Sequence, residues 1–253
     1  MNATAMRQGR AYRDRHEAGE ILAAHLIEQL GMPDDAVVLA LPRGGVPVGF
    51  EVARELGADL DVFVVRKLGV PQQPEFAMGA IAAGGFRLLN DSLVAQLRIS
   101  EDDVAAVTER EMIELQRREK LYRENRPPIN VHGRVAIIVD DGLATGFTMR
   151  AAIAAVRERG PLRLVVAVPV GAVETCEELS HEVGTLVCPF QPDPFHAVGL
   201  WYQDFTPTSD DEVHRCLAAA ATNHGAAHGS SRRRGSSPGP RNYGSEARAP
   251  GTS

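Results

Sequence analysis

Residues 135–148 read VAIIVDDGLATGFT, and this stretch is the most informative part of the chain. It begins with five apolar residues, the length and composition of a strand that is buried on both faces. Two adjacent acids follow, Asp140 and Asp141, and neighbouring carboxylates repel each other unless a ligand or a cation uses them. Glycines and threonines then lead into a helical pattern, so we expect a strand, a loop and a helix.

The residues after the two acids suit an anion. Backbone N–H groups and the positive end of a new helix converge there with the hydroxyls of Thr145 and Thr148, a combination that binds phosphate. The carboxylates of Asp140 and Asp141, one step earlier, suit the hydroxyls of a sugar attached to that phosphate. The alternative is an ordinary strand-to-helix loop, with a threonine capping the helix and both acids exposed.

Strands and helices alternate along the chain as far as residue 222. Continuous apolar runs predict strands at 36–41, 61–66, 134–140, 162–170 and 185–190. Helical periodicity predicts helices at 16–30, 46–56, 101–124, 147–159 and 173–181. The alternation is typical of an α/β fold with an open, mainly parallel, twisted sheet and helices on both faces. Ligands of such sheets bind beyond the carboxyl ends of the strands, where Asp140 and Asp141 are expected.

Two other strand ends lead into unusual loops. The loop 41–47 has paired glycines, which let the backbone approach a ligand closely, and Arg43 offers a forked donor to phosphate oxygens. A tight turn without a ligand is the alternative. The segment 65–76 places Arg66 and Lys67 at a strand end, followed by residues rich in Gly, Pro and Gln. The alternative there is a surface hairpin with a basic edge.

Composition excludes several classes of protein. Hydrophobic residues make up 44% and charged residues 24%, as in an ordinary globular protein. No apolar run approaches the roughly 18–20 residues of a membrane span, and the N-terminus lacks the apolar core of a signal peptide. We therefore expect a cytoplasmic protein that does not bind membranes. The three cysteines are far apart and form no metal-binding or disulfide pattern.

The formal net charge of −6 is unevenly distributed. Residues 223–253 hold five arginines and one acid, which leaves 22 bases against 32 acids in residues 1–222. Such an acidic body argues against general nucleic-acid binding. The tail is rich in Gly, Ser, Ala, Pro and Arg, so we predict one domain at 1–222 and disorder at 223–253. The arginines at 232–234 could touch nucleic acid or an acidic partner.

Over its whole length, the stretch 135–148 resembles the phosphoribosyl pyrophosphate motif of the type I phosphoribosyltransferases. That motif is a hydrophobic strand, two acids, a short variable stretch and Thr-Gly-x-Thr/Ser before a helix. The resemblance implies the type I fold, which includes a small hood. It also implies that Asp140 and Asp141 hold the ribose 2′- and 3′-hydroxyls. The 5′-phosphate would be wrapped by Ala144, Thr145, Gly146, Phe147 and Thr148.

The same resemblance gives roles to the other two loops. The 41–47 loop is similar to the family's pyrophosphate loop, with Arg43 and Gly44 as binding residues. The segment 65–76 is similar to the start of the mobile loop of adenine phosphoribosyltransferases, which closes over the reaction centre and excludes water. Lys67 and Arg66 would neutralise the pyrophosphate. Glu75 lies in the region where those enzymes keep a glutamate that acts as acid or base.

The acceptor is less well defined. Hypoxanthine-guanine transferases carry an acid at the position of Ala144, and alanine cannot act as an acid or base. The segment 195–204 loosely resembles the hood strand of hypoxanthine-guanine and xanthine transferases, where Phe195, Trp201 or Tyr202 would stack on a flat base. Core packing is the alternative for each of these aromatics. Residues 12–20 and 66–82 are similar to a bacterial branch of predicted transferases without an assigned substrate.

The resemblance implies a magnesium-dependent phosphoribosyltransferase of nucleotide metabolism. It would join phosphoribosyl pyrophosphate to a nucleobase-like nitrogen acceptor and release pyrophosphate. Mg²⁺ would be carried mainly by the substrate, with no direct protein ligand. Two alternatives stay open: a non-catalytic regulator that senses phosphoribosyl pyrophosphate and binds nucleic acid or a protein, and a hydrolase of phosphorylated sugars or nucleotides. The charged helix at 101–124 could be a solvated face or a homo-oligomer contact.

Overall fold

The computed structural model describes residues 12–124 and 126–231. Its centre is a five-stranded parallel sheet of order β2–β1–β6–β7–β8. β1 and β6 pair residue by residue, so their carboxyl ends lie side by side. The predicted mainly parallel sheet is therefore confirmed. The strands are β1 (Ala36–Ala40), β2 (Asp59–Val62), β6 (Val135–Val139), β7 (Arg163–Ala167) and β8 (Leu186–Val187).

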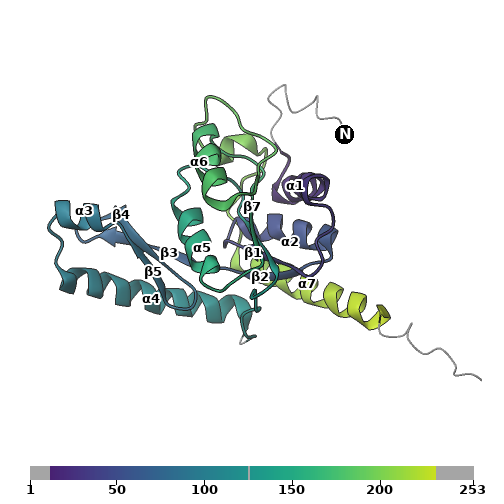
Figure 1. Ribbon diagram of the computed structural model, residues 1–253, viewed down its shortest axis with the longest axis horizontal. Coiled ribbons are helices and arrows are strands. Elements are labelled where there is room, and N and C mark those ends of the chain that lie inside the picture. Colours follow the sequence, from purple (N-terminus) through teal and green to yellow (C-terminus); the bar gives the residue numbers. More distant parts are fainter. Residues whose placement is uncertain (1–11, 125, 232–253) are drawn as a thin grey trace, which may run out of the picture.

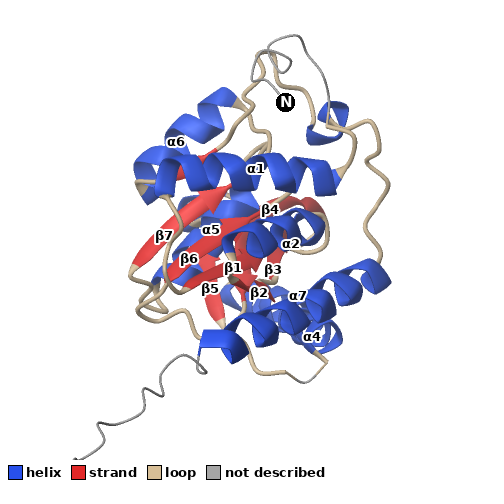
Figure 2. Ribbon diagram, turned by 90° about the vertical axis from the view of Figure 1, so that its right-hand side faces the viewer, coloured by secondary structure: helices blue, strands red, loops and turns tan. Residues whose placement is uncertain are grey.

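Helices cover both faces of this sheet, as Figures 1 and 2 show. One face carries α1 (Arg15–Leu30), α2 (Gly45–Leu56) and α7 (Asp210–Ser231), and the other carries α5 (Phe147–Arg157) and α6 (Val173–Val183). Successive strand residues alternate between two cores. Val38 and Ile137 belong to one hydrophobic cluster, and Val37 and Ala136 belong to the other. Burial on both faces explains why the strand sequences are continuous apolar runs.

A second, antiparallel sheet of order β3–β4–β5 projects from the main sheet, together with α3 and α4 (Figure 1). We call this part the arm; its elements are β3 (Val65–Val70), β4 (Gln73–Ala82), β5 (Phe86–Leu89), α3 (Asp91–Gln96) and α4 (Glu101–Arg123). The prediction of a single strand at 61–66 is wrong, because this range spans the end of β2 and the start of β3, which belong to different sheets. The segment 65–76, compared above with a mobile loop, forms a hairpin that turns at Pro71 and Gln72.

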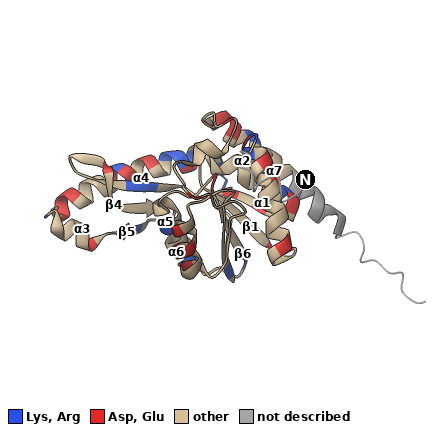
Figure 3. Cartoon of the chain, turned by 90° about the horizontal axis from the view of Figure 1, so that it is seen from above, with Lys and Arg blue, Asp and Glu red and all other residues tan. Residues whose placement is uncertain are grey.

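The charged helix α4 is amphipathic. Val104, Val107, Leu115 and Tyr122 are buried, and the helix packs against β3 and β4. Acidic and basic residues are interspersed along its length (Figure 3). The solvated-face interpretation thus holds for most of the helix, while an oligomer contact stays a prediction.

The chain returns at its C-terminal end to cover the carboxyl edge of the sheet. A short 3-10 helix, η2 (Val198–Trp201), precedes α7, whose Val213, Cys216 and Leu217 are buried. α7 continues to Ser231, beyond the domain end predicted at residue 222. Residues 232–253 lie outside the described part of the chain, so their predicted disorder is untested. Among the described helices, none is long and apolar enough to cross a membrane.

Candidate functional site

Asp140 and Asp141 follow the last residue of β6 at the carboxyl edge of the sheet. Asp140 Oδ1 accepts a hydrogen bond of 2.8 Å from the backbone N–H of Asp141. The loop after β1 lies directly against them. A Cβ atom on Gly44 would lie 2.0 Å from Asp141 Oδ2, and one on Gly45 would lie 2.8 Å from the Val139 carbonyl oxygen. Only glycines fit here, so the structure brings the predicted sugar residues and Gly44 together.

Burial and mutual repulsion shift the electrostatics of the two acids. Burial, and after it the charge of Asp141, raises the pKa of Asp140 well above its ordinary value. Burial also raises the pKa of Asp141, while the neighbouring Arg15 acts in the opposite direction. Within the described chain, Arg15 is the one cation beside these two desolvated carboxylates. Ligand hydroxyls or a second cation would stabilise them further.

The loop that follows Asp141 is held by hydrogen bonds to the segment 170–175. Leu143 is buried, and its backbone bonds both Val170 and Ala172 at 2.9 Å. The Thr175 hydroxyl donates to the Ala144 carbonyl oxygen at 2.7 Å. These bonds use groups that face the 170–175 segment, and the Ala144 side chain is exposed. These bonds fix the backbone of the loop in place.

The start of α5 is available to an anion. Gly146 has a φ of 72°, a conformation that favours glycine, and it places Phe147 at the first helical position. The first turn contains no acid and has no side-chain cap within the described chain. Thr145 is exposed and Thr148 half-buried beside it. The free N–H groups of this turn and the helix dipole make a site for phosphate.

Two further residues complete the surroundings of Asp141: Arg15, which sequence reasoning missed, and Tyr202, which it proposed only for stacking on the base. Arg15, the first residue of α1, donates from Nε to Asp141 Oδ2 at 2.9 Å. The Tyr202 hydroxyl donates to the Asp141 carbonyl oxygen at 2.6 Å. Arg15 lies 126 positions from its partner, so no local pattern could have identified it.

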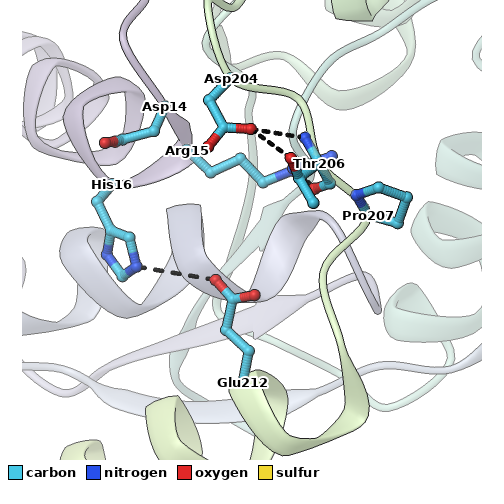
Figure 4. A pocket seen from close by; sticks show the side chains of 7 residues that line it. All are labelled: Asp14, Arg15, His16, Asp204, Thr206, Pro207 and Glu212. Atoms are coloured by element: carbon cyan, nitrogen blue, oxygen red, sulfur yellow. Dashed lines mark hydrogen bonds and ion pairs between the residues drawn. The ribbon is translucent and has the colours of Figure 1, made fainter.

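A pocket of about 260 Å³ lies on the other side of Arg15 (Figure 4). It is bounded by the start of α1, the segment 204–207 and the first turn of α7. Three of its seven lining residues are acidic; the residues are Asp14, Arg15, His16, Asp204, Thr206, Pro207 and Glu212.

The structure places the other predicted binding residues in different surroundings. Arg43 is exposed beside Gly44, and its Nη1 lies 3.8 Å from Asp210 Oδ1. Arg66 bonds Glu111 of α4 with distances of 2.5 and 3.1 Å. Lys67 is exposed and has no ion pair within the described residues.

Glu75 is exposed on β4. Within the described chain, neither it nor the two basic residues of β3 contact Asp140 or Asp141. The catalytic roles given to Arg66, Lys67 and Glu75 stay predictions.

The predicted base-stacking aromatics pack against other aromatic residues. Trp201 meets Phe190 edge to face, with ring centres 5.0 Å apart. Trp201 and Phe195 are both partly buried against a cluster that contains Tyr12 and Tyr202. Their contacts match the core-packing alternative, so a stacking role is still only a prediction.

Comparison with known proteins agrees with this geometry. The family model of the phosphoribosyl transferase domain matches residues 13–187, and the chain belongs to this family. The resemblance seen in residues 135–148 is thereby confirmed.

Two Mycobacterium tuberculosis proteins, from strains CDC 1551 and H37Rv, carry provisional names as phosphoribosyl transferases. Each is 48% identical to this chain over 200 residues, which are 79% of this chain and 45% of the relative. The chain thus spans less than half the length of the curated relatives it matches.

A solved structure, that of the protein TT1426 from Thermus thermophilus, is similar over most of both chains. It is 41% identical, with a TM-score of 0.72, and the match covers 83% of this chain and 98% of that one. The two chains therefore share their fold over most of their length.

Proposed function

We propose that the chain is a phosphoribosyltransferase, which uses phosphoribosyl pyrophosphate as donor and a nucleobase-like ring nitrogen as acceptor. One observation carries the proposal. The Asp140–Asp141 pair touches the Gly44 loop at the carboxyl edge of the sheet and is followed by the uncapped start of α5. This arrangement supports neighbouring sites for a sugar, its 5′-phosphate and a second phosphate group.

In this reaction the acceptor nitrogen forms a bond to C1′ of the ribose. The bond between C1′ and the pyrophosphate oxygen breaks, and pyrophosphate leaves with the electron pair. Asp140 and Asp141 would hold the ribose hydroxyls, and the turn from Thr145 to Thr148 would hold the 5′-phosphate. The chain's contribution is orientation of the sugar and placement of charge near the leaving group.

Magnesium fits this site as a companion of the substrate. Among the described residues, no group of three or more His, Cys, Asp or Glu side chains could hold a metal. The Asp140–Asp141 pair offers hard oxygen atoms, which a hydrated Mg²⁺ could reach through water while substrate oxygens supply the rest. Mg²⁺ would neutralise the pyrophosphate. We also propose a cytoplasmic location and a role in nucleotide metabolism.

The acceptor is the open part of the proposal. Ala144 is exposed in the loop and provides no acid or base. Any proton transfer to or from the acceptor would need a group outside this loop, and Glu75 is the residue we propose.

The test incubates the full chain with Mg²⁺, labelled phosphoribosyl pyrophosphate and a panel of purines, pyrimidines and other aromatic nitrogen bases. We expect pyrophosphate release that depends on one base and yields its nucleotide. Base-independent release of ribose phosphate or monophosphate would indicate a hydrolase instead. Tight binding of the donor without any release would favour the regulator.

A further inference from the structure

Arg15 is the one charged side chain that joins three separate segments around Asp141 within the described chain. It is the first residue of α1, and its side chain is only 10% exposed. Its Nε donates to Asp141 Oδ2 and its Nη1 donates to the Thr206 carbonyl oxygen, both at 2.9 Å. A Cβ atom on Gly44 would lie 3.3 Å from Arg15 Nε, so the loop after β1 is also in contact.

Aromatic rings fix the plane of the Arg15 guanidinium. Its central carbon lies 4.0 Å from the ring centre of Phe205 and 5.9 Å from that of Tyr202. Tyr202 in turn bonds the backbone of Asp141. A guanidinium that is bonded at two nitrogens and stacked on a ring has little freedom to rotate, so it holds its carboxylate partner in one orientation.

We propose that Arg15 is a positioning residue of the donor site, which orients the Asp141 carboxylate toward the ribose and ties it to the segment 202–206. This inference rests on the proposed function. Arg15 uses Oδ2 of Asp141, and Oδ1 is the atom left for a sugar hydroxyl. Arg15 acts through Asp141 and does not itself contact the substrate.

The charge of Arg15 has a second effect on the same site. Burial favours the protonated form of Asp141, and a protonated carboxyl accepts hydrogen bonds less well. A cation bonded to Oδ2 favours the ionised form, which is the better acceptor for a hydroxyl. Removing Arg15 would therefore disturb both the orientation and the charge of Asp141.

The pocket in Figure 4 makes the proposal testable by chemical rescue. Arg15 forms part of its wall, and the acids Asp14, Asp204 and Glu212 surround the rest. An acidic pocket of about 260 Å³ attracts small cations and has room for a guanidinium ion. In Arg15→Ala, such an ion could enter and replace the missing group next to Asp141.

The experiment measures binding of phosphoribosyl pyrophosphate with Mg²⁺ by calorimetry. We expect Arg15→Ala to weaken binding roughly 10- to 100-fold, the range for a lost hydrogen bond to a charged group. Millimolar guanidinium chloride should restore part of the affinity, whereas sodium chloride at the same ionic strength should not. Arg15→Lys should bind with intermediate affinity, because lysine keeps the positive charge but lacks the forked guanidinium that bonds two partners at once.

Arg123→Ala is the matched control. Arg123 is also buried and bonds Asp61 at 3.0 Å, and among the described residues no hydrogen bond or ion pair links either of them to Asp141. This variant should lose thermal stability but keep wild-type affinity, with no response to guanidinium.

Wild-type affinity in Arg15→Ala, or a loss that guanidinium does not reverse, would overturn the inference. If Arg15→Ala is unfolded at the assay temperature, Arg15→Lys carries the comparison, and unchanged affinity there overturns it equally. Absence of binding by the wild-type chain is a different result, because it removes the proposed function itself.

Discussion

At the scale of single residues, Asp140 combines a proposed role in binding with a cost in stability. Asp140 is half-buried beside Asp141, and desolvation raises the pKa of its carboxyl group. The folded chain therefore holds a proton that the unfolded chain releases above about pH 3.9. Stability contributed by this group is present below that pH and is lost as the pH rises toward the raised pKa of the folded state.

Asp140→Asn should consequently stabilise the chain at neutral pH. Asparagine keeps an oxygen for the Asp141 N–H and removes the buried charge. We expect a gain of about 1 kcal/mol, which for a chain of this size raises the melting temperature by roughly 2–4 °C. Melting curves from pH 4 to pH 8 should show the gain growing with pH. A variant that is less stable than wild type at neutral pH would contradict this reading of the site.

Residue-level prediction from the sequence works best where candidate residues form a local pattern. Asp140, Asp141 and Gly44 stood out because acids at a strand end and paired glycines are unusual in a short segment; the structure brings them together, and their binding roles stay predictions. Arg15 was missed because an arginine at the start of a helix is ordinary, and its meaning depends on a contact with a residue far along the chain. Trp201 was proposed for stacking on a base because a single sequence does not show that Phe190 packs against it.

At the scale of elements, the parallel strands were predictable and the arm was not. Strands such as β6 are covered on both faces, so their sequences are unbroken runs of apolar residues. Phe63 and Val64 are buried although they lie in neither sheet, so the apolar run continues through the point where the chain leaves β2 for β3. The hairpin turn could not be predicted from the sequence for another reason. Gln72 adopts a φ of 61°, where glycine or asparagine would have been the usual signal.

The β3–β4 hairpin separates two neighbouring cations, because successive strand residues point to opposite faces. Arg66 is bound to Glu111 of α4, whereas Lys67 has no ion pair in the described chain. We expect Arg66→Met to lower stability by about 1–2 kcal/mol, between the values for exposed and buried ion pairs. Chemical denaturation of the two proteins measures this difference, and equal unfolding free energies would show that the pair contributes nothing.

Lys67→Met should instead leave the melting temperature unchanged and lower kcat/KM about 100-fold, if Lys67 neutralises the leaving group. Lys120→Met, at an exposed position of α4, is the matched control and should match wild type in both measurements. Full activity in Lys67→Met would remove this lysine from the proposed mechanism.

At the scale of the whole molecule, the charge distribution separates the enzyme from the nucleic-acid regulator. Residues 1–222 are strongly acidic, while five arginines lie in 223–253. α7 is part of the core through Val213 and Leu217 and extends to Ser231, so the boundary for a truncation is residue 231 and not residue 222.

Deleting residues 232–253 should leave the affinity for phosphoribosyl pyrophosphate and the melting temperature unchanged. We expect no salt-dependent binding of duplex or single-stranded nucleic acid with either chain, measured by fluorescence anisotropy. Nucleic-acid binding by the full chain that disappears on truncation would favour the regulator.

The most direct measurement of the central claim is calorimetric titration of phosphoribosyl pyrophosphate, with Mg²⁺, into wild type and the double variant Asp140→Asn with Asp141→Asn. Both proteins should be folded, because asparagine is close to aspartate in size and keeps hydrogen-bonding capacity. We predict that wild type binds and that the double variant gives no detectable heat of binding. Equal affinity in the two proteins would contradict the assignment of these carboxylates to the ribose.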